Sequence, residues 1–235
     1  MSVLVSGMIA GWPRRGHRLL ELYCGDGRFL ESFWQSGFDV TGQERDPNLL
    51  SKARARLKQT ADFTCGHPEH LPFEDRTFDY VVCLNGLHHR PRETLNEMCR
   101  LAAHGLLLAF PNAWSIHGLS RFFLRPKPGS GFKQLFHPYE IQSWLRAGGR
   151  EARIRWASNL LGPACTWHGR NGLAGINLVS IPLPLGAYAM IRLDFSPPMA
   201  GSGILLNIPR SLGPKPTVNG LGRSGRRLSQ TVPPK

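Results

Sequence analysis

The residues best suited to hold a ligand are a glycine turn and an acidic residue near the start of the chain. Gly25 and Gly27 are the third and fifth residues of the run Tyr23-Cys24-Gly25-Asp26-Gly27. Glycine adopts positive φ and has no side chain, so the backbone can approach a ligand while N–H groups of a following helix point at it. Glu44 follows 17 residues after Gly27, where its carboxylate could accept hydrogen bonds from both hydroxyls of a ribose. This pair predicts a ligand that carries a ribose.

Alternating strands and helices must position these residues. The residue pattern predicts strands at 18–22, 38–42, 62–65, 78–85, 105–110, 151–157 and 187–195, and helices at 28–36, 47–58, 93–101 and from 138 to about 147. This alternation indicates a mostly parallel, doubly wound α/β sheet. Ligands of such sheets bind outside the carboxyl ends of the strands. The segments expected there are 21–27, 43–46, 66–69, 85–89 and 111–114.

In the order and spacing of its motifs, the chain resembles the class I S-adenosylmethionine-dependent methyltransferases, in their methyltransferase type 11-like group. The resemblance covers about residues 18–156 and rests on LLELYCGDGRF (19–29), VTGQERDP (40–47), FTCGHPEHLPF (63–73), FDYVVCLNGLHH (78–89) and GLLLAFPN (105–112). It implies a Rossmann-like doubly wound fold, S-adenosylmethionine as the cofactor and methyl transfer as the activity.

The resemblance also assigns cofactor-binding residues. It implies that the first turn borders the methionine part, with Glu21, Tyr23, Gly25 and Gly27, and that Glu44 holds the ribose. It places Arg45, His67, Pro68 and Glu69 near the adenine. It places Asn85, Leu87 and His88, in the loop after the fourth strand, under the sulfonium.

Two positions depart from the family pattern. The family usually has glycine at Tyr23 and aspartate at His67, and Pro68 lacks a backbone N–H for a hydrogen bond to the adenine. A degenerate, non-catalytic member therefore remains an alternative. Dinucleotide oxidoreduction is a weaker alternative, because that fingerprint needs a third glycine or alanine where this chain has Leu30.

Histidines after the fourth strand are the candidate catalytic residues. His88 and His89 lie where a base could accept a proton from a hydroxyl or enol acceptor, and an imidazole titrates in the useful range. His137 and Tyr139 are further candidates. The loop from Asn85 to His88 lacks the N/D-P-P-aromatic signature of amino-methylating nucleic-acid enzymes, and no Pro-Cys motif offers a nucleophile for cytosine C5 methylation. A small-molecule acceptor, such as a phenol, quinone, sugar or lipid head group, is favoured.

The positive charge is concentrated at the two ends of the chain. The formal net charge is +13, yet residues 1–18 and 196–235 hold nine of the 29 basic residues and no acidic residue. A basic tail raises association rates with polyanions, so RNA methylation that uses residues 196–235 stays open as an alternative. Proline and glycine make up 13 of the residues in that tail, which predicts disorder.

Cysteine usage and hydropathy bear on compartment and domain organisation. The five cysteines are widely spaced without a CxxC pair, which predicts reduced thiols in a cytoplasmic protein and no metal site. The apolar start of the chain precedes its arginines, unlike a secretory signal, and no run of about 18 apolar residues predicts a membrane span. We expect an N-terminal segment (1–17), a methyltransferase domain (18–195) and a tail (196–235). Residues 113–138 are expected to form either a lid-like insertion or an ordinary packed connection.

Overall fold

The computed structural model describes residues 2–84, 87, 90–123, 134–161 and 181–195. The chain divides into one unit that spans Met1–Pro197 and a second that spans Pro198–Lys235. The second unit, and with it nearly all of the predicted tail, lies outside the described residues. The site residues Asn85, His88 and His89 also lie outside them.

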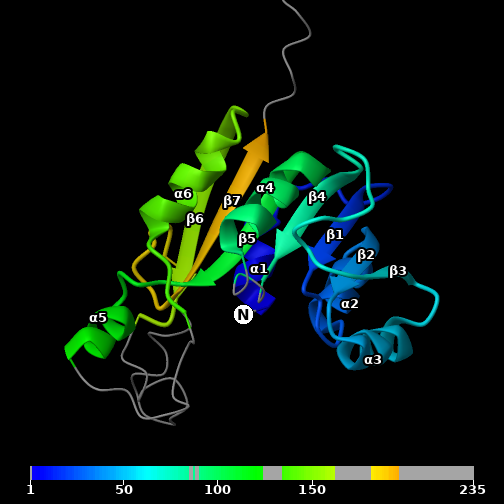
Figure 1. Ribbon diagram of the computed structural model, residues 1–235, viewed down its shortest axis with the longest axis horizontal. Coiled ribbons are helices and arrows are strands. Elements are labelled where there is room, and N and C mark those ends of the chain that lie inside the picture. The colour runs from blue at the N-terminus through cyan, green and yellow to red at the C-terminus, as the bar shows by residue number, and fades with distance from the viewer. Residues whose placement is uncertain (1, 85–86, 88–89, 124–133, 162–180, 196–235) are drawn as a thin grey trace, which may run out of the picture. The chain divides into compact units, whose positions relative to one another are not determined.

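Helices and strands alternate through most of the first unit (Figure 1). Their bounds, in chain order, are α1 (Ser2–Met8), β1 (Arg18–Leu22), α2 (Arg28–Gln35), β2 (Asp39–Glu44), α3 (Pro47–Leu57), β3 (Ala61–Cys65), β4 (Phe78–Cys83), α4 (Pro91–Leu101), β5 (Ala102–Pro111), α5 (Ile116–Phe123), α6 (Pro138–Ala147), β6 (Ala152–Asn159) and β7 (Tyr188–Phe195).

Within the described residues, seven strands form one sheet in the order β3-β2-β1-β4-β5-β7-β6. The pairs from β3 to β5 are parallel, whereas β7 runs antiparallel to both β5 and β6. The β7 arrowhead accordingly lies at the end of the sheet opposite to that of β4 (Figure 1). The predicted fold class, a Rossmann-like, doubly wound and mostly parallel sheet, is confirmed.

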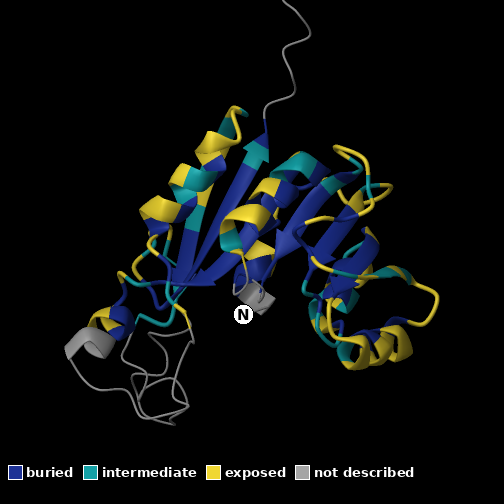
Figure 2. Cartoon of the chain, in the orientation of Figure 1, coloured by how far each residue is buried: buried dark blue, intermediate teal, exposed yellow. Residues whose placement is uncertain are grey.

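Helices cover both faces of the sheet because the strand residues are apolar on both sides. Successive side chains of a strand point to opposite faces: Leu20 and Leu22 of β1 pack in one apolar cluster, and Leu19 packs in the other. The first cluster also contains side chains of α4 and α6, and the second contains those of α1, α2 and α3. The strands are therefore mostly buried, while the outer surfaces of the helices are exposed (Figure 2).

The sequence pattern did not reveal α1, which is part of the core. Leu4, Val5 and Met8 of α1 are buried against the sheet face that also holds α2. Arg192 of β7 donates hydrogen bonds to the carbonyl oxygens of Met8 and Ala10. These acceptors end a seven-residue helix that is too short to persist alone, so packing and this distant arginine stabilise it.

A second unpredicted helix, α5, lies in the segment expected to be a lid or a connection. Asn112 precedes it and is fully buried: its amide donates to the carbonyl oxygens of Pro184 and Gly186 and accepts from the N–H of Trp114. The described part of this segment is thus fixed to the chain that leads into β7. The lid-like role of residues 113–138 stays a prediction, since 124–133 lie outside the described residues.

In the described part of the chain, no helix has the length and hydropathy needed to cross a lipid bilayer.

Candidate active site

The strand register brings the predicted cofactor-binding segments to one edge of the sheet. Leu22, at the end of β1, pairs with Gln43 of β2 and with Cys83 of β4. Glu44, at the end of β2, pairs with Cys65 at the end of β3. Because these strands are parallel, the loops that follow all four leave at the same carboxyl edge, as the sequence predicted.

The two glycines of the first turn have different surroundings. Both have positive φ, 58° at Gly25 and 77° at Gly27. A Cβ added to Gly25 would meet no atom within 4 Å, whereas a Cβ on Gly27 would lie 2.8 Å from Leu57 Cδ1 and 3.1 Å from Ala53 Cβ. Gly25 therefore leaves open space at the site, and Gly27 allows the start of α2 to pack on α3.

Tyr23 occupies the family's glycine position in the backbone conformation that favours glycine. Its φ is 53°, a left-handed conformation that costs a non-glycine residue on the order of 1 kcal/mol. Its half-buried ring packs against the apolar core. Burial, followed by the charge of Glu69, raises the pKa of the Tyr23 hydroxyl to about 12, so this hydroxyl stays protonated at neutral pH. The bulky residue is thus accommodated without loss of the turn.

The carboxylate of Glu44 binds backbone amides on two loops. Its Oε2 accepts a 2.9 Å hydrogen bond from the N–H of Gly25, and its Oε1 accepts bonds of 2.7 and 3.1 Å from the N–H groups of Arg45 and Asp46. A carboxylate offers about four acceptor positions. Glu44 therefore holds the glycine turn in place and retains acceptor capacity for a ligand hydroxyl.

Glu21 is a buried carboxyl group with an unsatisfied oxygen. It is 1% exposed, and Oε2 has no hydrogen-bond partner among the residues that the structure describes. Burial raises the pKa of Glu21 well above its usual value, and the charges of Asp26 and Glu44 raise it further. A buried acceptor without a hydrogen bond is unfavourable. A cationic or hydrogen-bond-donating ligand would supply the partner that Glu21 Oε2 lacks.

Gln43 is a structural residue of the site that the sequence pattern did not identify. It is fully buried, its Oε1 accepts from the N–H of Tyr23 at 3.1 Å, and its Nε2 donates to the carbonyl of Gly66 at 2.7 Å. Gln43 therefore links the loops that follow β1 and β3. Its one sequence signal was the place next to Glu44 at the end of a strand.

The remaining predicted residues lie in several environments. Arg45 and His67 are exposed, and His67 Nδ1 lies 3.7 Å from Glu69 Oε2. Pro68 and Glu69 are buried. Leu87 is 1% exposed and belongs to the apolar core on the side of α4 and α6, so packing explains its residue type.

Aromatic side chains gather beyond the end of β5. The ring centroids of Trp114 and Tyr139 are 4.9 Å apart in an edge-to-face arrangement, and Trp114 is 6.4 Å from His137. All three residues are exposed. The structure thus places Trp114 beside His137 and Tyr139, the two further candidates for the base. The sequence signal of Trp114 was only its place after the fifth strand.

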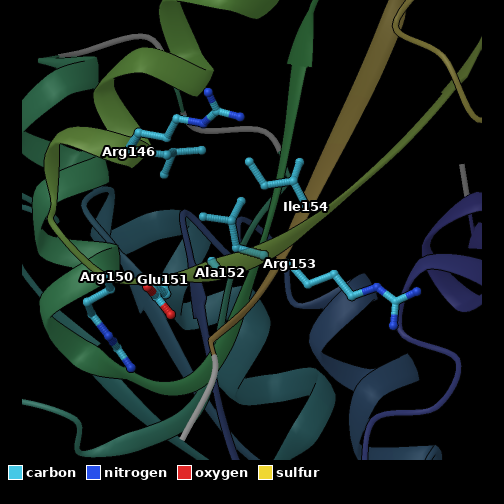
Figure 3. A pocket seen from close by; sticks show the side chains of 8 residues that line it. Arg146, Arg150, Glu151, Ala152, Arg153 and Ile154 are labelled. Carbon is cyan, nitrogen blue, oxygen red and sulfur yellow. The ribbon is translucent and has the colours of Figure 1, made fainter. Parts of the chain in front are cut away.

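A cavity of about 610 Å³ lies elsewhere, between the end of α6 and the start of β6. Figure 3 shows that the side chains of Arg146, Arg150 and Arg153 point in different directions there. Arg150 donates to the carbonyl oxygens of Cys99 and Ala103 and lies 3.6 Å from the centroid of the Phe195 ring. Since its polar groups do not converge on one ligand, this cavity is not the candidate site.

Sequence comparison relates the same region to known proteins. Residues 19–106 match the family described as methyltransferase domain. The ubiquinone biosynthesis O-methyltransferase of Coxiella burnetii (strain Dugway 5J108-111) is 26% identical over 149 residues, which cover 57% of this chain and 64% of that protein. The match thus spans less than two thirds of the length of this curated relative.

Solved structures share the fold. A methyltransferase from Thermotoga maritima, described as a possible histamine N-methyltransferase, has a TM-score of 0.63 at 21% identity and covers 83% of this chain and 89% of its own. Magnesium protoporphyrin IX methyltransferase from Synechocystis PCC 6803, solved with bound SAH, has a TM-score of 0.60 at 15% identity, with coverage of 83% and 81%. The strand order and these solved structures show a Rossmann-like methyltransferase fold, and residues 19–106 of this chain are similar to the methyltransferase domain family.

Proposed function

We propose that this chain binds S-adenosylmethionine at the carboxyl edge of β1 and β2 and transfers its methyl group to a small-molecule acceptor. The observation that carries the proposal is the unsatisfied Oε2 of Glu21, which lies in the same site as the Glu44 carboxylate and the open space beside Gly25. Fold alone would not support the activity, because one fold hosts many functions.

The residues present fit this cofactor in charge and in hydrogen bonding. Glu21 offers a buried acceptor for a cationic amino group, and Glu44 keeps acceptor capacity for a ribose hydroxyl. Gly25 leaves room for close approach. Tyr23 preserves the turn, which argues against the non-catalytic alternative. Arg45, His67, Pro68 and Glu69 remain our candidates for the adenine edge, and Asn85 and His88 for the sulfonium, whereas the side chain of Leu87 packs in the core.

The aromatic group beyond β5 supports an acceptor with a flat, partly apolar ring. Trp114 and Tyr139 offer two exposed ring surfaces at an edge-to-face angle, and aromatic surfaces of this kind commonly line small-molecule sites. The printed name of the Coxiella relative concerns O-methylation in ubiquinone biosynthesis. A phenolic or quinol-type hydroxyl is therefore the acceptor class that we favour over RNA.

When bound, S-adenosylmethionine supplies an electrophilic methyl group, and the chain's main task is to hold the acceptor in line with it. Glu21 and Glu44 would fix the cofactor, while Trp114 and Tyr139 would orient the acceptor ring. His88 and His89, which lie outside the described residues, are our candidates to accept the hydroxyl proton. His137 is a further candidate because it lies 6.4 Å from Trp114.

Calorimetry with S-adenosylmethionine tests the cofactor site. We expect micromolar binding by the wild type and at least tenfold weaker binding by Glu44→Gln, which has one fewer charged acceptor but a similar shape. Glu140→Gln, a change at an exposed glutamate of α6, is the matched control and should bind as the wild type does. Equal affinity of Glu44→Gln and wild type would overturn the assigned site.

Methyl transfer is then measured with phenol, catechol and RNA acceptors at two salt concentrations. Turnover of a phenolic acceptor that is lost in His88→Gln or His89→Gln supports the proposed reaction. Turnover of RNA alone, falling steeply with salt as phosphate contacts require, would replace the small-molecule proposal. Tight cofactor binding without turnover of any acceptor would favour the non-catalytic alternative.

A further inference from the structure

Two histidines and an aspartate meet at the opposite, amino edge of the sheet. His17 directly precedes β1, Asp79 is the second residue of β4, and His104 is the third residue of β5. Since β1, β4 and β5 are neighbours in the sheet, these three positions converge although they lie far apart in the sequence. One donor atom from each residue lies within 4.8 Å of the other two.

Two of the donor–donor distances can be compared with those of a metal site. Asp79 Oδ1 lies 3.4 Å from His17 Nδ1 and 2.9 Å from His104 Nδ1. Bonds of 2.0–2.2 Å to a tetrahedral ion place neighbouring donors about 3.4 Å apart. One distance therefore fits, and the others need adjustments that side-chain rotations supply.

Groups behind the donors fix their orientation. The second carboxylate oxygen of Asp79, Oδ2, accepts a 2.8 Å hydrogen bond from the backbone N–H of Arg18, which turns Oδ1 toward the two histidines. The ring of Tyr80 lies 6.0 Å from the His17 ring and 6.2 Å from the His104 ring, and it stacks on Trp12 at 4.1 Å. A hydrogen bond such as that from Arg18 to Asp79 is what holds a metal-binding residue in place, while the Tyr80 ring packs beside the two histidines.

The cluster is accessible and incompletely satisfied as it stands. The side chains of His17, Asp79 and His104 are 30%, 21% and 56% exposed, so an ion could enter and keep a water ligand. His17 Nδ1 is itself buried, and its 3.4 Å contact with Asp79 Oδ1 does not meet hydrogen-bond geometry. Two imidazoles with a single carboxylate suit Zn²⁺ and similar ions, whereas Mg²⁺ and Ca²⁺ prefer oxygen ligands.

We propose that His17, Asp79 and His104 form a binding site for a divalent transition-metal ion, Zn²⁺ foremost, with a fourth position open to water. The site would tie the segment that enters β1 to β4 and β5, at the edge of the sheet away from the candidate active site. The sequence analysis predicted no metal site because the chain has no CxxC pair. A CxxC pair indicates thiolate sites and does not detect a site built from histidine and aspartate. The proposal does not depend on methyl transfer.

Zn²⁺ titration of the full-length chain, freed of any purification tag and dialysed against EDTA, tests the site by calorimetry. We expect one Zn²⁺ per chain, with at least tenfold weaker binding in His104→Gln and in His17→Gln. The matched control is His70→Gln, which removes an exposed histidine outside the cluster and should leave the affinity unchanged. Stoichiometric binding that persists equally in all three variants would overturn the assignment, as would the absence of binding.

Co²⁺ substitution distinguishes this site from binding by a cysteine such as the exposed Cys65. A nitrogen–oxygen site should give visible ligand-field bands without the sulfur-to-cobalt charge-transfer band in the near ultraviolet. A charge-transfer band would assign the ion to a thiolate and refute the proposal. A saturating ion should also raise the Tm of the wild type by several degrees but leave that of His104→Gln nearly unchanged, a comparison that holds whether or not S-adenosylmethionine binds.

Discussion

Two buried glutamates, Glu21 in β1 and Glu97 in α4, have opposite hydrogen-bonding surroundings. Glu21 has an oxygen without a partner among the described residues, and burial raises its pKa. Glu97 of α4 accepts bonds of 2.8 and 2.7 Å from Arg100 and one of 2.9 Å from the N–H of Leu71. Burial alone would raise the pKa of Glu97, but these donors outweigh it and lower the pKa.

The difference separates a carboxyl group that supports the fold from one that awaits a ligand. The pair of Glu97 and Arg100 fastens the loop before β4 to α4, since Arg100 also donates to the carbonyl of Phe73 at 2.8 Å. The Oε2 atom of Glu21 accepts no hydrogen bond from the described residues and so links no segments of the fold. Buried polar groups are nearly always paired, so an unpaired one at the carboxyl edge of such a sheet points to binding.

The largest expected change in stability and in cofactor affinity is that of Glu21→Gln. The raised pKa means that the folded, cofactor-free chain keeps a proton that the unfolded chain loses above about pH 4.5, so this group makes stability fall as pH rises above that value. We expect Glu21→Gln to stabilise the cofactor-free chain at pH 7 by about 1–3 kcal/mol, measured by urea unfolding. It should also weaken S-adenosylmethionine binding by about 100-fold, since a cationic ligand favours the ionised form of Glu21, which glutamine cannot supply.

A Glu21→Gln variant that loses both stability and affinity would contradict this reasoning. That result would mean that Glu21 supports the fold as Glu97 does. Glu140→Gln serves as the control for the loss of one negative charge at an exposed position.

For Glu97→Gln we expect the opposite change in stability, a loss in place of a gain. Because the pKa of Glu97 is lowered, its contribution is complete above about pH 4.5 and is lost as pH falls through its folded-state value. The variant should lose about 2 kcal/mol of stability at pH 7, with unchanged cofactor affinity. Urea unfolding at pH 7 and pH 4 should show the gap between wild type and variant narrowing at the lower pH. A gap independent of pH would show that shape, and not charge, supports the loop.

The smallest effect is a difference between two glycine variants. Gly25→Ala and Gly27→Ala share the strain of a positive φ, but only the latter places a Cβ against Leu57 and Ala53. Gly27→Ala should therefore be less stable than Gly25→Ala by about 1 kcal/mol, and Gly25→Ala should show the greater loss of S-adenosylmethionine affinity. Thermal unfolding and calorimetry of the pair measure both quantities. Equal stabilities, or the opposite order of affinities, would show that the two positions have been assigned the wrong roles.

The sequence by itself determined the strands and predicted the edge of the sheet at which a cofactor would bind. Alternation of apolar residues fixed the strands to within a few residues, and the glycine turn and Glu44 fell at strand ends, because these signals are local in the chain. Five ordered motifs were enough to predict the domain family that residues 19–106 match. The segment 85–89, which holds His88 and His89, remains a sequence prediction.

Only the tertiary structure decided which of these residues pack against other side chains and which lie beside open space. It placed Gly27 against α3 and left Gly25 open, buried Leu87 in the core, and joined α1 to Arg192 across most of the chain. It also brought His17, Asp79 and His104 together. These contacts depend on strand order, which is set by the packing of distant segments, and no local pattern of residues encodes it.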